Sequence, residues 1–146
     1  MNWIDDRIKQ RQVEASRSAV IDSSAEQIFN DLWDEINRWV AEAKQKNLPV
    51  FTNGTPYERI VSLSVPPPSG RSQSNPRQLT IRLAREKKAI VVGGISAGGQ
   101  SVQLTLDVCD DGVICIKHYG ERVSVSEIAM QILDHFLFPE LQTGKL

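Results

Sequence analysis

The spacing of apolar residues changes at residue 50, and this change constrains the fold more than any other feature of the sequence. Between residues 23 and 47, apolar side chains recur every three or four positions and share one stripe of a helix. From 50 to 119 they alternate with polar ones, as in strands that bury one face. The helical spacing returns over 124–138. These periods predict an α+β protein.

Two N-terminal helices are expected within residues 1–47. The second begins near Ser23 or Ser24, because glutamate or glutamine stands three residues on, as in a capping box. Leu48-Pro49 ends it. The first has only a thin apolar stripe, which comprises Trp3, Ile4, Ile8, Ala15 and Ala19. Such a helix either lies on the surface of the domain or pairs with another chain, and the pattern leaves both open.

Five strands are expected within 50–119, joined by short turns. They are 56–65, 78–84, 89–92, 102–109 and 113–118. Short connections predict an antiparallel meander. The segment 66–76 is rich in Pro, Ser and Gly, so we expect a mobile loop there. A C-terminal helix over 124–138 completes a single domain, 1–146, in the order α-α-β-β-β-β-β-α, with the helices packed on one face of the sheet.

Composition excludes several classes of protein. The formal net charge is −1, so the whole chain has no excess of charge that predicts a polyanion or membrane partner. No window has the roughly 18 apolar residues of a membrane span. Two cysteines in a chain of 146 residues favour a reducing compartment, and we expect a cytoplasmic protein.

The segment DVCDDGVICIKH, residues 107–118, holds both cysteines and one of the two histidines. Burial favours a hairpin in which Asp110-Asp111-Gly112 is a three-residue loop with Gly112 in the left-handed conformation. This register pairs Cys109 with Val113. It places Leu104, Leu106, Val108, Ile114 and Ile116 on one face of the sheet.

The same register argues against chemistry at the cysteines. His118 falls on the face opposite Cys109 and Cys115, which excludes a zinc site made by these three residues. As diagonal neighbours the cysteines are expected about 7–8 Å apart at Cα, beyond the usual range of a disulfide. Neither histidine is placed as a base for a thiol. We therefore predict no catalytic residue, no metal ligand and no cofactor.

The segment 71–88 is the one basic region, and it suggests a nucleic-acid interface as an alternative function. Its cationic residues are Arg71, Arg77, Arg82, Arg85, Lys87 and Lys88. They could contact phosphates. Strands 78–118 contain no aromatic residue, however, which argues against a base-stacking sheet.

The leading hypothesis is a non-enzymatic protein-interaction or adaptor module that forms a homodimer. It rests on the thin first helix and on a second sheet face made of small side chains. The candidate partner surface comprises Trp3, Trp33, Thr105, Asp107, Cys109, Cys115 and Lys117. A small-ligand or enzyme site, where Gly93–Gly99 meets the 66–76 loop, ranks lowest, because no nucleophile–base or carboxylate pair is apparent.

Overall fold

A computed structural model describes residues 2–64, 77–95, 101–144 and 146. It contains two α-helices, α1 (Trp3–Gln45) and α2 (Val125–Leu137), and two 3₁₀ turns, η1 (Arg85–Lys87) and η2 (Pro139–Leu141). The strands are β1 (Val50–Gly54), β2 (Glu58–Leu63), β3 (Arg77–Ala84), β4 (Ala89–Gly93), β5 (Val102–Val108), β6 (Ile114–His118) and β7 (Glu121–Val123). The predicted α+β class is confirmed, while the predicted loop 66–76 lies outside the described residues.

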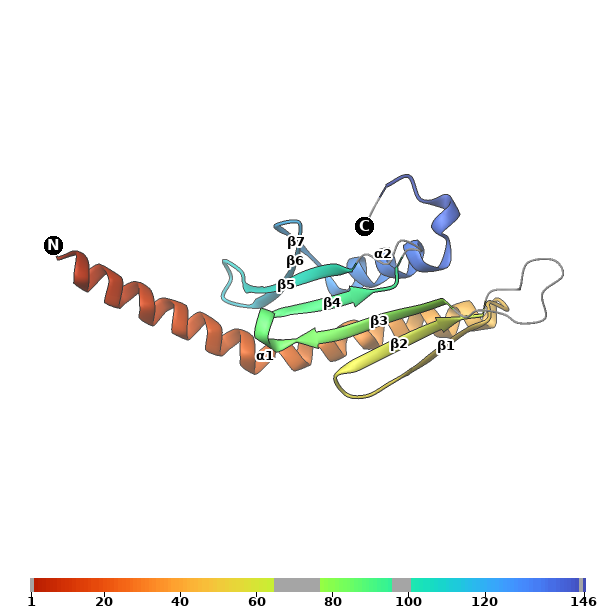
Figure 1. Cartoon of the computed structure of the whole chain (residues 1–146), viewed down its shortest axis with the longest axis horizontal. Coiled ribbons are helices and arrows are strands. Elements are labelled where there is room, and N and C mark those ends of the chain that lie inside the picture. The colour runs from red at the N-terminus through yellow and green to blue at the C-terminus, as the bar shows by residue number, and fades with distance from the viewer. Residues whose placement is uncertain (1, 65–76, 96–100, 145) are drawn as a thin grey trace.

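The strands form one antiparallel sheet in the order β1-β2-β3-β4-β5-β6-β7, and both helices lie behind it in Figure 1. The meander is therefore as predicted, but with seven strands instead of five. The two additional strands are short and lie at the edges of the sheet. β7 follows a tight turn at Tyr119–Gly120, in which Tyr119 has a φ of +52°. In a strand at the edge of a sheet, apolar and polar residues alternate less regularly than in a central strand. The sequence pattern therefore did not predict these two strands.

The two predicted N-terminal helices are one continuous helix of 43 residues, α1, so the break before residue 23 was wrong. No Gly or Pro stands between Trp3 and Gln45. Ser23 does not cap a helix; its hydroxyl donates to the carbonyl of Val20, 3.0 Å away, within the helix. Serine accepts such a position because its side chain can bond to the preceding turn.

The C-terminus of α1 and the N-terminus of α2 lie where the sequence predicts them. At the end of α1, Asn47 takes a left-handed conformation with a φ of +67°, and the Leu48 N–H donates to the carbonyl of Ala43. This is a Schellman arrangement. At the start of α2, Ser124 accepts a hydrogen bond from the Glu127 N–H, which confirms the predicted cap.

The core lies between the helices and one face of the sheet. α1 contributes a stripe that includes Phe29, Leu32 and Ile36, and α2 contributes Ile132 and Phe136. All five are essentially inaccessible to solvent. The sheet supplies Val61, Leu79, Ile81, Leu83, Ile90, Val92, Leu104, Leu106 and Ile116. Gly94, just after β4, packs so closely that a Cβ would meet the Gln78 carbonyl oxygen.

The N-terminal third of α1 leaves this core. Figure 1 shows the red end of the helix running away from the sheet, and every residue from 2 to 17 is exposed. The first buried residue of the helix is Ile21. We call residues 3–16 the projection.

Candidate interaction surface

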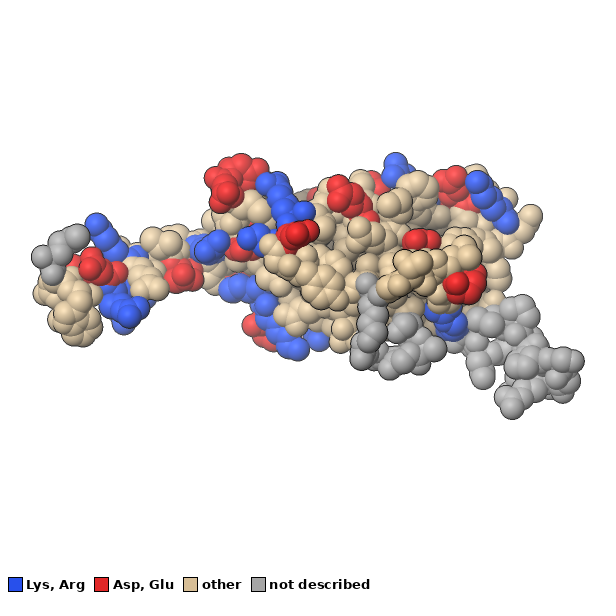
Figure 2. Space-filling view, turned by 90° about the horizontal axis from the view of Figure 1, so that it is seen from above, with Lys and Arg blue, Asp and Glu red and all other residues tan. Residues whose placement is uncertain are grey.

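Four large apolar side chains of the projection are exposed to solvent. Trp3 is 72% exposed, Ile4 47%, Ile8 48% and Val13 63%. Acidic and basic side chains stand among them along this narrow part of the molecule (Figure 2). Ile4 and Ile8 share one side of the helix and form a narrow apolar stripe that a partner can cover, whereas Val13 lies on the other side.

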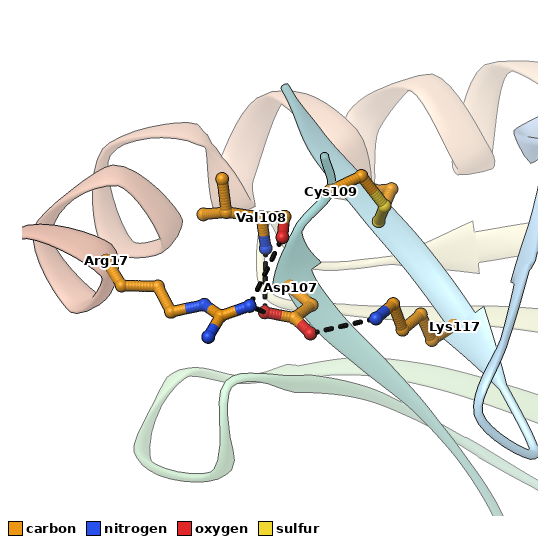
Figure 3. A network of polar contacts seen from close by, with 6 residues as sticks. Arg17, Asp107, Val108, Cys109 and Lys117 are labelled. Carbon is orange, nitrogen blue, oxygen red and sulfur yellow. Dashed lines mark hydrogen bonds and ion pairs between the residues drawn. A yellow bond between two sulfur atoms is a disulfide. The ribbon is translucent and has the colours of Figure 1, made fainter. Parts of the chain in front are cut away.

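Arg17 marks the point where α1 joins the body. Its guanidinium lies 3.0 Å from the Asp107 carboxylate on β5 and donates to the Val108 carbonyl at 3.3 Å (Figure 3). Lys117, on β6, approaches the other Asp107 oxygen at 3.1 Å. One carboxylate thus links the base of the projection to two strands of the sheet.

This environment shifts the titration of Asp107. Burial alone would raise the pKa of its carboxyl group. The backbone N–H of Val108, together with Lys117 and Arg17, outweighs burial and holds the pKa below its usual range. The carboxylate is therefore charged at neutral pH and can keep both cationic partners.

The hairpin beside Arg17 has the predicted register. The Cys109 N–H donates to the Val113 carbonyl, and Gly112 has a φ of +77°. Leu106 pairs with Ile116, and both side chains are buried. The three-residue loop is confirmed, because only this register buries the apolar set.

The prediction for the cysteines was wrong, because Cys109 and Cys115 form a disulfide. Their Cα atoms are 6.1 Å apart, within the usual range of about 4.4–6.8 Å. The expected 7–8 Å assumes a flat ladder, whereas the right-handed twist of a hairpin shortens one diagonal. Free cysteines were one reason to expect the cytoplasm, and the bond removes that reason.

The other predicted partner residues do not form one surface. Trp33 is only 8% exposed, and its ring lies beside the Arg59 guanidinium, so it belongs to the core edge. Thr105 is exposed on the open sheet face, whereas Cys115 is 3% exposed. Trp3 lies on the projection, where the sequence pattern indicated only a thin apolar stripe.

The cationic residues of 71–88 are distributed over both ends of β3. At one end Arg85 and Lys88 pair with acidic residues of α1, Glu26 and Asp22, each at 3.2 Å. At the other, Arg77 donates to the Ile95 carbonyl and its guanidinium lies over the Phe136 ring. Arg82 pairs with Glu86 at 3.6 Å, and Arg71 lies outside the described residues. Nucleic-acid binding by this segment remains a prediction.

A cleft of about 660 Å³ lies between the start of β5, the β6–β7 turn, the end of α2 and the C-terminal segment. Both histidines line it, as do Ile95 and Ser101, the described ends of the glycine-rich connection. The Nε2 atom of His118 is buried without a partner among the described residues, and burial lowers its pKa. Among the described lining residues there is no Asp, Glu or Cys, and hydroxyl groups are supplied by Ser101, Tyr119 and Thr143.

A shallower groove of about 480 Å³ runs between the end of α1 and α2. Its lining is largely apolar and includes Trp39, Leu48, Met130 and Phe138. It lies at the end of α1 opposite the projection (Figure 1).

Within the described ranges, no three His, Cys, Asp or Glu side chains gather as metal ligands, and neither helix has an apolar stretch long enough to cross a membrane. The comparisons with known proteins carry no further assignment. The chain matched no protein-family model, no curated protein and no solved structure.

Proposed function

We propose that this protein is an interaction module that associates with a second copy of itself through the projection. The observation that carries the proposal is the uncovered length of α1, where every residue from 2 to 17 is exposed. This end of α1 continues a helix already begun and buries no apolar side chain of its own, so a partner that covers it adds burial energy.

Charge supports a second copy as that partner. The projection carries Arg7, Lys9 and Arg11 against Asp5, Asp6 and Glu14, so its net charge is 3 − 3 = 0. Two such helices do not repel each other overall, and the whole chain is also near neutral. A helix with equal numbers of both signs can offer each charge an opposite charge on an identical helix.

The association should be weak. Two helices of about four turns bury less than the roughly 1,200–2,000 Å² typical of stable interfaces. We therefore expect an equilibrium between one and two copies that shifts with concentration. Such an equilibrium suits a module that assembles reversibly.

Sedimentation velocity over about 5–500 µM, the range of a weak interface, tests the proposal. The test variant is Ile8→Glu, on the apolar stripe, and the matched control is Val13→Glu, which is exposed but lies on the other side of the helix. We expect the wild type and Val13→Glu to dimerise with rising concentration, while Ile8→Glu stays monomeric. A wild type that is monomeric throughout would contradict the proposal.

A further inference from the structure

We infer that two copies pair antiparallel along the projection, with Arg7 of each copy opposite Glu14 of the other. The inference rests on the proposed function and adds the direction and register of the pairing. It follows from the order of side chains on a helix that no described residue of the body covers.

The apolar stripe has the spacing of a helix–helix seam. Ile4, Ile8, Arg11 and Ala15 follow one another at intervals of four, three and four residues. This is the heptad pattern of positions that face a partner helix, with Ile8 and Ala15 at one seam position and Ile4 and Arg11 at the other. The positions that flank the seam include Arg7 and Glu14.

A parallel pair is disfavoured by Arg11. In parallel pairing each seam residue meets its own copy, so two Arg11 guanidinium groups would lie side by side at the centre of the interface. Like charges in contact are destabilising, and no acidic seam residue is present to separate them. Parallel pairing would also set Arg7 opposite Gln12, without an ion pair.

An antiparallel pair resolves both difficulties. Ile8 of one copy then meets Arg11 of the second copy, whose aliphatic stem can cover it while the guanidinium reaches water. Ile4 meets Ala15 of the second copy. The flanking positions bring Arg7 opposite Glu14, and the two-fold symmetry forms this ion pair twice.

The shape of the molecule permits this arrangement. At 1.5 Å per residue the projection is about 21 Å long, and an antiparallel overlap of this length leaves the two bodies at opposite ends. Trp3 would lie level with Ser16 of the second copy, just before Arg17 joins that copy's body. Within one chain the described residues of the body leave all residues from 2 to 17 exposed.

Cysteine cross-linking distinguishes the two directions. Chains carrying Ile4→Cys or Ala15→Cys are oxidised separately and as a mixture, and the cross-linked peptides are identified by mass spectrometry. Antiparallel pairing predicts a 4–15 cross-link in the mixture only, because identical positions are about 16 Å apart along the helix. Cross-linking of Ile4→Cys with itself would overturn the inference, as would association without the 4–15 product.

The outcomes separate this inference from the proposed function. If the chains associate in sedimentation but cross-link only between identical positions, the function stands and the direction is wrong. If no association occurs at any concentration, both fail.

Reversing charges provides a second test. Arg7→Glu and Glu14→Arg should each weaken dimerisation about tenfold, since each affects two ion pairs, while the double variant restores it. Lys9→Glu, away from the seam, is the control. A double variant as weak as the single ones would contradict the predicted Arg7–Glu14 contact.

Discussion

The two parts of α1 differ in what surrounds them, although they form one unbroken helix. Residues 21–45 place a stripe of apolar side chains against the sheet and α2, whereas residues 3–17 are all exposed and Arg17 links their end to β5. The helix continues through residues 3–17 although they are not packed against the body. Good helix-forming residues and the absence of Gly or Pro therefore suffice to extend a helix already begun. Burial therefore fixes where the helix is stable, while local sequence fixes how far it continues.

Matched substitutions of isoleucine in the two parts should show the largest difference. Ile36 is fully buried, so Ile36→Ala should lower the free energy of unfolding by about 2–5 kcal/mol through lost burial and a cavity. Ile8→Ala, in the projection, should change that of the monomer by less than about 0.5 kcal/mol. Urea denaturation at low protein concentration measures both changes in the free energy of unfolding. Equal changes would show that the projection packs on the body of its own chain.

The disulfide at the hairpin beside Arg17 should contribute the next largest effect. The double variant Cys109→Ser/Cys115→Ala removes the bond. Alanine is chosen at position 115 because the Cys115 side chain is buried. Because the closed loop is short, we expect a loss of about 2 kcal/mol in the free energy of unfolding. Thermal unfolding of the wild type with and without a dithiol reductant should give the same loss. No change on reduction would contradict a bond that stabilises the hairpin.

Much of the fold could be predicted because burial imposes a period on the sequence. The hairpin register followed from the need to put Leu106 and Ile116 on one face, and the cap at Ser124 followed from Glu127. The join between the two N-terminal helices could not be predicted, since a serine fits both a cap and a helix interior. β1 and β7 were not predicted because a strand at the edge of a sheet needs little alternation of apolar and polar residues.

A pH titration should change the stability of the body through His118. Burial lowers the pKa of His118 below its usual value of 6.5, so the unfolded chain binds the proton more readily than the folded one. Stability is therefore full above pH 6.5 and falls as the pH drops through the folded pKa. Asp107 and Asp111, whose pKa values are lowered from 3.8, stay charged over pH 5–7.

The variant His118→Phe isolates this histidine. It keeps an aromatic ring beside Tyr119 and removes the unpartnered Nε2 atom, so it should be tolerated at pH 7.5. Urea denaturation between pH 7.5 and 5 should show a smaller loss of stability than in the wild type. An identical slope would show that His118 is not the titrating group.

The smallest effect is expected at the boundary between the two parts of α1. Arg17→Gln breaks the ion pair with Asp107. Because both side chains of this pair are partly exposed, the loss should cost about 0.2–1 kcal/mol in the free energy of unfolding. Lys117→Gln is the matched control on the same carboxylate. Only Arg17→Gln should increase fraying of the projection, measured as a loss of helical circular dichroism in the dilute protein. Equal losses of helix in both variants would show that Arg17 does not anchor the projection.

The candidate site was only partly visible in the sequence. The thin stripe of Trp3, Ile4 and Ile8 was recognised, but periodicity cannot show whether a helix is covered by its own chain. The contact of Arg17 with Asp107 joins residues 90 positions apart and has no local signal. Trp33 lies at the margin of its stripe, which in the sequence fits both a core edge and a partner surface, and in the structure its ring lies beside Arg59 from a distant strand.

Amide hydrogen exchange at two protein concentrations tests the central comparison most directly. In dilute protein, the amides of residues 5–16 should exchange fast while those of 25–43 stay protected; at high concentration, the projection alone should gain protection. Unchanged fast exchange of the projection at high concentration would contradict self-association. Strong protection in the dilute monomer would contradict the account of an end of α1 that lacks a partner.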